Sequence, residues 1–116
     1  MGHTDEVNCI ALSSDDKILV SGDSDRSIKI WNLESRKNVQ TLIGHSKCVA
    51  CVAISSDGKT LVSGSDDKTV KVWNLQRGEE NKTLSGHSDA VECVTINSKA
   101  NIIVSGGRDK KIIIWS

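Results

Sequence analysis

The chain of 116 residues contains no phenylalanine, no tyrosine and no proline, and three tryptophans are its only large aromatic residues. Most of the apolar burial must therefore come from Ile, Val, Leu and Ala. No apolar run approaches the roughly 20 residues that a membrane-spanning helix needs. The first residues also lack the basic flank and apolar core of a secretory signal. We therefore expect a protein of the cytoplasm, with the nucleus as the second compartment, and no membrane partner.

The chain also lacks an excess of charge of either sign, since 15 basic residues balance 15 acidic ones. Nucleic-acid-binding domains usually carry a basic patch, so this balance disfavours nucleic acid as a partner. The four cysteines do not form the pattern of a disulfide framework. Cys9, Cys51 and Cys93 recur every 42 residues inside apolar runs. We expect reduced thiols with a structural role.

What the sequence does contain is one pattern, repeated three times. The stretch 63–73 reads SGSDDKTVKVW, and its counterparts are 21–31 and 105–115, so the period is 42 residues. A fixed period of this length indicates a repeat architecture. The first two units agree at 20 of 42 positions. Aligned on their Gly-His pairs, the units are 2–43, 44–85 and 86–116.

Each unit reads as short strands separated by polar turns, and no helical pattern competes with this reading. The runs that open the units are apolar and nearly continuous, which is typical of strands covered on both faces. The third unit has no fourth strand. The predicted strands are 7–12, 18–21, 27–32 and 38–43 in the first unit, 49–54, 61–63, 69–74 and 81–85 in the second, and 91–96, 102–105 and 111–116 in the third.

A Gly-His pair, an Asp in a tight turn and a Trp recur in register in every unit, and with these landmarks the chain resembles the WD40 repeat family over essentially its whole length. The resemblance implies an all-β fold, a WD40-type β-propeller segment over 1–116. It has three four-stranded antiparallel blades, with the last lacking its outer strand, so the ring is incomplete. The second residue of the family's Trp-Asp pair is Asn32, Asn74 or Ser116 here, which leaves the expected fold unchanged.

In that family a His, a Ser or Thr, an Asp and a Trp of each blade form a hydrogen-bonded tetrad. The resemblance assigns this structural role to His3, Ser21, Asp25 and Trp31, to His45, Ser63, Asp67 and Trp73, and to His87, Ser105, Asp109 and Trp115. His, Ser and Asp are also the residue types of a hydrolase triad, but a nucleophile would not be expected three times over. We therefore expect no catalytic residue and no enzyme.

Cys48 and Cys51, which lie close to His45 in the sequence, are a candidate metal or redox site. Structural zinc sites are usually built from four protein ligands, and the chain has no second cysteine pair of this spacing. Residues three apart in a strand also point to opposite faces. We expect no metal and no cofactor.

The resemblance implies a protein–protein interaction scaffold or adaptor module that presents a propeller surface to peptide or protein partners. The residues exposed there in the family flank the opening Val of each first strand and precede the turn Asp. Among them Arg108 is the expected anchor. The alternative is a histone-tail or nucleic-acid-associated binding module. The candidate partner-binding residues are Glu6, Asn8, Ser24, Cys48, Ala50, Asp66, Ala90, Glu92 and Arg108.

The open ring leaves two explanations. The chain is a fragment of a larger WD40 protein, or it assembles with copies of itself as a homo-oligomer. The strand 111–116 is apolar and has no outer neighbour, which makes it a template for association. Ile113 stands where the other units have Lys29 and Lys71, so we expect a lysine at that position to reduce self-association.

Overall fold

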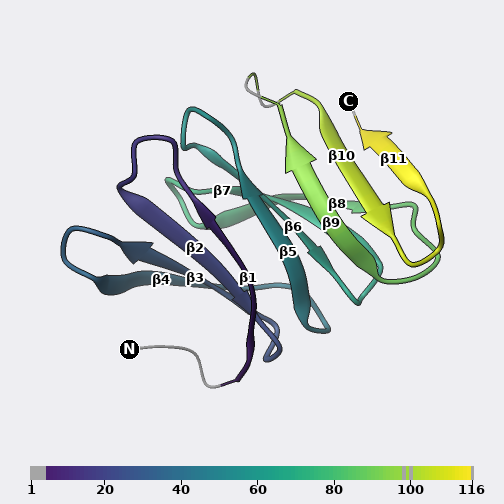
Figure 1. The fold of residues 1–116 in the computed structure, drawn as a ribbon, viewed down its shortest axis with the longest axis horizontal. Helices are drawn as coiled ribbons and strands as arrows, with labels where there is room; N and C mark the ends of the chain where they lie inside the picture. The colour runs from purple at the N-terminus through teal and green to yellow at the C-terminus, as the bar shows by residue number, and fades with distance from the viewer. Residues whose placement is uncertain (1–4, 98, 100, 116) are drawn as a thin grey trace.

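The computed structural model describes residues 5–97, 99 and 101–115. These residues form three antiparallel sheets of four, four and three strands, called blades one, two and three here (Figure 1). The described part contains no helix, and so none that could span a membrane. The strands are β1 (Val7–Leu12), β2 (Ile18–Asp23), β3 (Ser27–Asn32) and β4 (Lys37–Ile43), then β5 (Val49–Ile54), β6 (Thr60–Ser65), β7 (Thr69–Asn74) and β8 (Glu79–Ser85), then β9 (Val91–Ile96), β10 (Ile103–Gly107) and β11 (Ile112–Trp115).

Local turn chemistry explains why the strands reverse where they do. Between β5 and β6 the Ser55 hydroxyl donates to Asp57 over 2.5 Å, and the same carboxylate accepts the Lys59 N–H over 3.0 Å. The Ser55 bond is the main cause that holds the pKa of Asp57 below its ordinary value. Gly58 adopts a φ of 72°, which costs glycine no steric strain. The Asp-Gly pair therefore closes the hairpin between the predicted strands 49–54 and 61–63.

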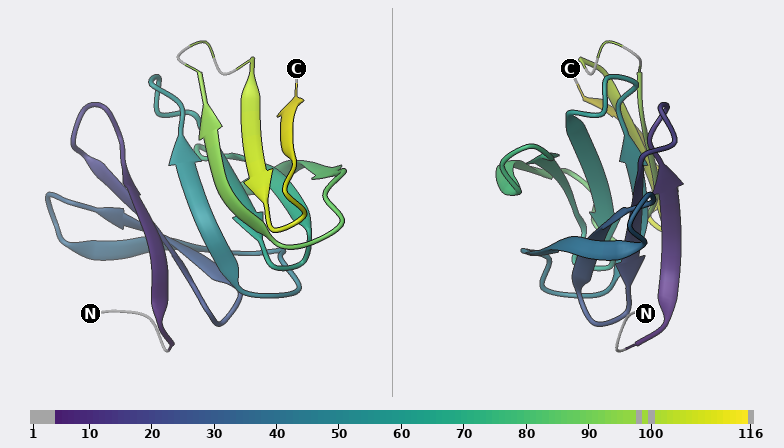
Figure 2. Two further views of the ribbon diagram at one scale, coloured as in Figure 1. Left: turned by 45° about the vertical axis from the view of Figure 1, so that its right-hand side comes forward. Right: turned by 90° about the vertical axis from the view of Figure 1, so that its left-hand side faces the viewer.

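The blades follow one another along the longest dimension of the molecule, from the purple N-terminal sheet to the yellow C-terminal strand (Figures 1 and 2). Their first strands, β1, β5 and β9, pack side by side. Asn8 Nδ2 donates to the Val49 carbonyl over 3.1 Å and so joins the first two blades directly. Because the three strands run in the same sense, their opening residues gather at one end of the molecule.

The core lies between the blades. One cluster fills the space between blades one and two, and it includes Val20, Ile28, Leu61 and Trp73. The second fills the space between blades two and three, and it includes Val62, Val70, Val91 and Ile103. Blade two thus contributes one apolar face to each cluster and has both faces covered, whereas blades one and three each contribute a single face.

The outer faces of the end blades stay exposed, which changes the prediction made for the last strand. Ile112 and Ile114 are 78% and 69% exposed, whereas Ile113 is half-buried. Strand alternation explains the difference, because Ile113 points to the face that lies against blade two. The exposed apolar pair of β11 is therefore Ile112 and Ile114, and Ile113 is not among the exposed residues.

Candidate functional site

The best-developed polar network lies inside blade two, where its members come from β6, from β7, from the turn between these strands and from the loop before β5. Trp73 Nε1 donates to Ser63 Oγ over 2.8 Å, and Ser63 Oγ lies 2.7 Å from His45 Nε2. His45 Nδ1 lies 2.9 Å from the Asp67 carboxylate. Trp73, Ser63 and His45 are buried, so each depends on the others for a hydrogen-bonding partner.

The protonation states in this network follow from burial and geometry. Burial lowers the pKa of His45 below its ordinary value, although the Asp67 carboxylate acts in the opposite direction. A neutral ring fits the contacts, with Nδ1–H donating to Asp67 and Nε2 accepting from the Ser63 hydroxyl. Burial raises the pKa of Asp67, but hydrogen bonds from Thr69 and His45 outweigh it, and the net pKa lies below the ordinary value. The contact is therefore a hydrogen bond from neutral imidazole to carboxylate.

Blade three contains the same network with one hydroxyl fewer. Trp115 Nε1 donates to Ser105 Oγ over 2.9 Å, and Ser105 Oγ lies 2.8 Å from His87 Nε2. His87 Nδ1 lies 3.0 Å from the nearer carboxylate oxygen of Asp109. Lys111 stands where blade two has Thr69, whose hydroxyl donates to Asp67. The turn carboxylate of blade three therefore loses one donor.

In blade one the structure describes three of the four expected members, Ser21, Asp25 and Trp31. Trp31 Nε1 donates to Ser21 Oγ over 2.9 Å, as in the other blades. His3 lies outside the described residues, and Asp25 is exposed. Blade one also has a fully buried carboxylate, Asp23, which accepts the Ser27 N–H over 3.0 Å and the Ser27 hydroxyl over 2.9 Å.

Sequence reasoning missed Asp23. The sequence did offer one signal for it. Unit one has an acidic residue at position 23, where the other units have the uncharged residues Ser65 and Gly107. An acidic residue at the end of an apolar strand, two residues before the turn Asp, needs donors of its own if it is buried. The donors are close in sequence, because Ser27 follows after a tight turn.

The nine candidate partner-binding residues fall into three sets, and a backbone hydrogen bond closes each set. Ser24 N–H donates to the Glu6 carbonyl over 2.9 Å, and Asp66 N–H to the Cys48 carbonyl over 3.2 Å. Arg108 N–H donates to the Ala90 carbonyl over 2.9 Å. Each bond joins the start of a first strand to the turn before the third strand. Since β1, β5 and β9 are neighbours, the three sets lie at one end of the molecule.

The side chains of these sets also meet within each blade. Asn8 Nδ2 lies 3.2 Å from Ser24 Oγ, and the Cys48 thiol donates to Asp66 over 3.0 Å. Arg108 Nε donates to Glu92 Oε1 over 3.1 Å, and these two side chains are 64% and 56% exposed. A pair this exposed adds little to stability, which leaves the guanidinium available to a partner.

Exposure separates the candidates into stronger and weaker ones. Glu6, Asn8, Glu92 and Arg108 are exposed, and Ser24, Cys48, Ala50 and Asp66 are half-buried. Ala90 is only 4% exposed, so its side chain does not belong to the surface. Its strand position explains the correction, because Ala90 lies directly before the fully buried Val91 and turns its carbonyl toward Arg108.

The cysteines are all free thiols. Burial raises the pKa of Cys9 to about 11 and that of Cys51 to about 12. The pKa of Cys48 is also raised to about 11, mainly by burial and additionally by its bond to Asp66. A carbon added at Gly64 would lie 2.6 Å from Cys51 Sγ, so a small residue is needed opposite the thiol.

Residues 5–97, 99 and 101–115 contain no group of three or more His, Cys, Asp or Glu that could hold a metal ion.

Comparisons with known proteins agree with this geometry. The family model described as "WD domain, G-beta repeat" matches residues 1–32, 36–74 and 78–116. The solved "Structure of U3-55K" superposes with a TM-score of 0.95 at 32% identity, over 99% of this chain and 37% of that one.

Two curated relatives each match about one repeat. WD repeat-containing protein 18 of Rattus norvegicus is 39% identical over 41 residues, which is 35% of this chain and 10% of the relative. U3 small nucleolar RNA-interacting protein 2 of Homo sapiens is 44% identical over 43 residues, which is 37% of this chain and 9% of the relative. The matched stretches thus span about a tenth of the length of these curated relatives.

Proposed function

The chain belongs to the WD40 repeat family, and from that premise we propose that it is a protein–protein interaction scaffold that presents one end of its blades to a peptide or protein partner. The observation that carries the proposal is that Glu6 and Asn8 of blade one and Glu92 and Arg108 of blade three are all exposed at the end of the molecule where β1, β5 and β9 begin. Asn8 and Glu92 lie within β1 and β9, where positions are held more precisely than in loops. Glu6 directly precedes β1, and Arg108 lies in the turn between β10 and β11.

The chemistry of this end suits a partner that carries both charge and hydrogen-bonding groups. Arg108 offers a planar guanidinium that binds carboxylates well, and Glu6 and Glu92 offer carboxylates of their own. No aromatic residue is present among the nine candidates, so we expect affinity from several polar contacts rather than from one buried anchor. The polar networks inside the blades serve the fold in this proposal, and we assign no catalytic role to any of them.

The test is a peptide selection against the purified chain, followed by titration of the selected peptides against two charge-reversal variants. Arg108→Glu changes the proposed surface. Lys17→Glu makes the same change at an exposed residue in the turn at the far end of β1. We expect Arg108→Glu to weaken binding about tenfold or more, as for a central charged contact, and Lys17→Glu to leave it unchanged. Equal effects of the two variants would remove the support for this surface.

A second candidate function has one observation in its favour. A relative is named as a U3 small nucleolar RNA-interacting protein, so a nucleic-acid-associated role is the alternative that we retain. Titrating an RNA oligonucleotide at several salt concentrations distinguishes the two, because phosphate contacts make the logarithm of affinity fall steeply with that of salt. An RNA affinity that is weak or independent of salt would favour the protein–protein interaction scaffold over the nucleic-acid-associated role.

The organisation of the chain and its compartment are part of the same proposal. We divide it into repeat units 2–43, 44–85 and 86–116 of one partial propeller. Of the two compartments expected from the sequence we favour the nucleus, because a curated relative is named for a nucleolar RNA. Imaging a tagged full-length protein would test the compartment.

A further inference from the structure

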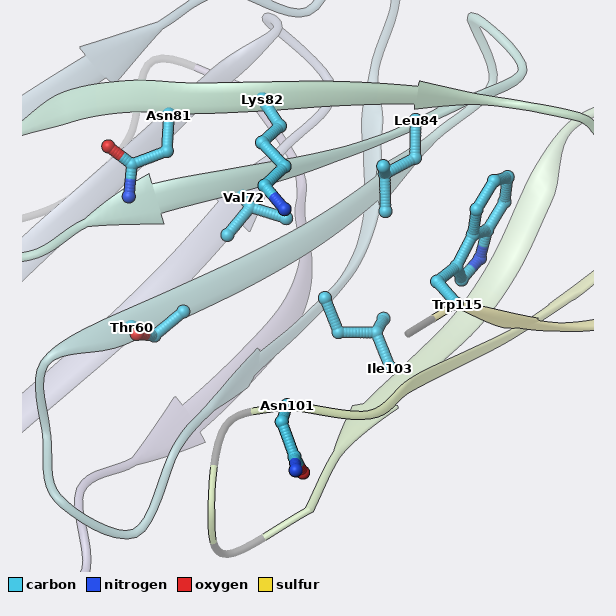
Figure 3. Close-up of a pocket in the computed structure, with 8 residues that line it drawn as sticks. All are labelled: Thr60, Val72, Asn81, Lys82, Leu84, Asn101, Ile103 and Trp115. Atoms are coloured by element: carbon cyan, nitrogen blue, oxygen red, sulfur yellow. The ribbon is translucent and has the colours of Figure 1, made fainter.

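The packing of blade two on blade three differs in two places from the packing of blade one on blade two. The first is a pocket of about 390 Å³ beside Trp115, which Val72, Leu84 and Ile103 also line (Figure 3). One unit earlier Leu75 belongs to the cluster that fills the corresponding space. The repeat thus has its own residue for this pocket, which therefore needs no occupant from another molecule.

The second difference lies at the end of the molecule where β1, β5 and β9 begin, and it concerns the second residue of each strand. In β1 this residue is Asn8. Its Nδ2 lies 3.1 Å from the Val49 carbonyl of blade two and 3.2 Å from Ser24 Oγ of its own blade. The amide of Asn8 therefore fills the space between the surface of one blade and the backbone of the next.

Blade two has the same space without the amide. Ala50 stands at the position of Asn8, Asp66 at that of Ser24, and Val91 of blade three at that of Val49, each 42 residues further along the chain. β5 packs against β9 as β1 packs against β5. A methyl group cannot donate a hydrogen bond, so position 50 offers nothing to the Val91 carbonyl.

This difference does not arise from the open ring. The residues that border the space belong to β5, to β9 and to the turn after β6, and the structure describes all three segments. The residue that fills the equivalent space in blade one stands at a position that blade two also has. The cause is therefore the exchange of asparagine for alanine.

The groups around Ala50 provide two acceptors for N–H donors. Asp66 accepts the Cys48 thiol at Oδ2 over 3.0 Å, and its Oδ1 can accept a further donor. By the 42-residue equivalence, the Val91 carbonyl is the second acceptor, as its counterpart is in blade one. Ala50 and Asp66 are half-buried, so a group bound between them would be partly shielded from water.

Arg108 of blade three provides a donor near the same space. Its Nε donates to Glu92 over 3.1 Å, which leaves further N–H donors on the guanidinium. Burial is the main cause that raises the pKa of Cys48 to about 11, and the positive charge of Arg108 acts in the opposite direction. The guanidinium therefore lies close enough to blade two to act on the thiol beside Asp66.

Two acceptors and one donor select an uncharged group. A carboxylate would lie against the carboxylate of Asp66, and an ammonium would lie near Arg108 and has no acceptor. A primary carboxamide donates two N–H bonds and accepts through its oxygen. Its N–H groups match Asp66 and the Val91 carbonyl, and its oxygen matches Arg108.

We propose that Ala50, Asp66, Val91 and Arg108 form an amide site, which binds the side-chain carboxamide of a glutamine or asparagine of the protein partner in the way that the Asn8 amide is bound between blades one and two. The inference rests on the proposed function, because it names a residue type that the partner brings to that surface. The chain's own Asn8 supplies the geometry of the bound group.

The experiment uses three probes that share one backbone and differ only in the side chain. They are N-acetylglutamine methylamide and the corresponding glutamate and lysine compounds. Each is titrated into the isotopically labelled chain, and nuclear magnetic resonance follows the backbone amide of residue 50 and the Nε–H of Arg108. Two variants receive the same residue at different places. Ala50→Asn puts the chain's own amide into the site, and Lys17→Asn puts it into an exposed turn at the far end of β1.

We expect saturable shifts with the glutamine probe and an affinity at least about tenfold lower for each of the other two, the scale of one hydrogen bond. Ala50→Asn should abolish the shift of Arg108 without lowering the melting temperature, because blade one already holds an asparagine at this position. Lys17→Asn should leave the affinity unchanged.

Equal affinities for the three probes would overturn the proposal, and so would the absence of saturable shifts at the highest soluble concentration. Tighter binding of the lysine or the glutamate probe would also overturn it, since the site would then select a charge. This comparison is made on the wild-type chain, so it does not depend on the folding of a variant. Glutamine binding that Ala50→Asn leaves unchanged would place the probe elsewhere and count against the site.

The outcome is independent of the test of the scaffold. If the amide site fails while Arg108→Glu still weakens the selected peptides, the partner surface stands and only the carboxamide is wrong. If no peptide is selected while the glutamine probe binds as expected, the scaffold loses its support and the amide site keeps its own.

Discussion

Blades two and three carry the same polar residues at the same spacing, yet they differ in what surrounds them. Val70 and Val72 of blade two are 0% and 8% exposed, whereas their counterparts Ile112 and Ile114 are 78% and 69% exposed. The polar distances barely change, since the Trp–Ser bond is 2.8 Å in one blade and 2.9 Å in the other. The internal network is thus set within a blade, while burial is set by the neighbouring blades.

This difference separates two sources of stability. The hydrogen bonds of a blade satisfy buried polar groups, and losing a partner costs the desolvation of the group left behind. The apolar faces stabilise only when a second blade covers them, because the gain scales with the area removed from water. Substitutions at equivalent positions of the two blades can therefore measure the two contributions separately.

The largest expected effect comes from the turn carboxylate of blade two. Asp67 accepts hydrogen bonds from His45, Thr69 and the Ser46 N–H, so Asp67→Ala leaves several donors without an acceptor. We expect a loss of about 2–4 kcal/mol in the free energy of unfolding. Urea denaturation followed by tryptophan fluorescence measures it.

The matched substitution, Asp109→Ala, should cost less than Asp67→Ala. Blade three has Lys111 in place of Thr69, so its carboxylate accepts no hydroxyl at that position. A loss at Asp109 equal to or larger than that at Asp67 would contradict the view that the extra hydroxyl strengthens the network of blade two.

The second prediction concerns the apolar faces. Val70→Ala removes two methyl groups from a fully buried site in the cluster between blades two and three. We expect a loss of about 2 kcal/mol, the usual scale of a cavity left by a small truncation. Ile112→Ala, at the equivalent and exposed position, should change the free energy of unfolding by less than about 0.5 kcal/mol. A comparable loss at both positions would mean that the outer face of blade three is covered in solution.

The sequence was sufficient for the repeat, the fold and most strand positions, because period, turn residues and alternation are local properties. β3 and β7 begin and end where predicted, at Ser27–Asn32 and Thr69–Asn74. The prediction started β8 two residues late, since Glu79 already pairs with Asn74 across the turn. Polarity alone does not reveal such a pairing.

Features that depend on neighbouring turns, strands and blades could not be predicted from the sequence. The burial of Asp23 required knowing that Ser27 would return to it across a tight turn. The exposure of Ile112 and Ile114, rather than Ile113, required knowing which face of the strand lies against blade two. The pocket beside Trp115 arises between two blades, and no single unit of the sequence contains it.

The third prediction uses acid to weaken blade two selectively. The folded pKa of His45 lies below its ordinary value of 6.5 because of burial, so the unfolded chain binds this proton more readily. Stability should therefore fall as the pH drops below about 6.5, by at most about 1.4 kcal/mol per pH unit for one group. The lowered pKa of Asp67 adds a further loss as the pH falls through its ordinary value of 3.8.

Denaturation curves at a series of pH values test this, with His45→Gln as the control variant. The variant should be less stable at pH 7 and should lose stability less steeply between pH 6.5 and 5. An unchanged pH dependence would show that another group is responsible.

The smallest expected effect is a difference in labelling rate between two cysteines. It leaves stability unchanged and reports on the exposed outer face of blade three. Cys51 is buried, with a pKa raised to about 12, whereas Cys93 at the same repeat position is exposed. Since the thiolate is the reactive form, a maleimide should label Cys93 well before Cys51. Mass spectrometry of peptides from a labelling time course distinguishes them, and a Cys93→Ser variant identifies the fast site. Protection of Cys93 that disappears on dilution would mean that the outer face of blade three is covered by a second molecule, so the contrast between the two blades would then describe only the isolated chain.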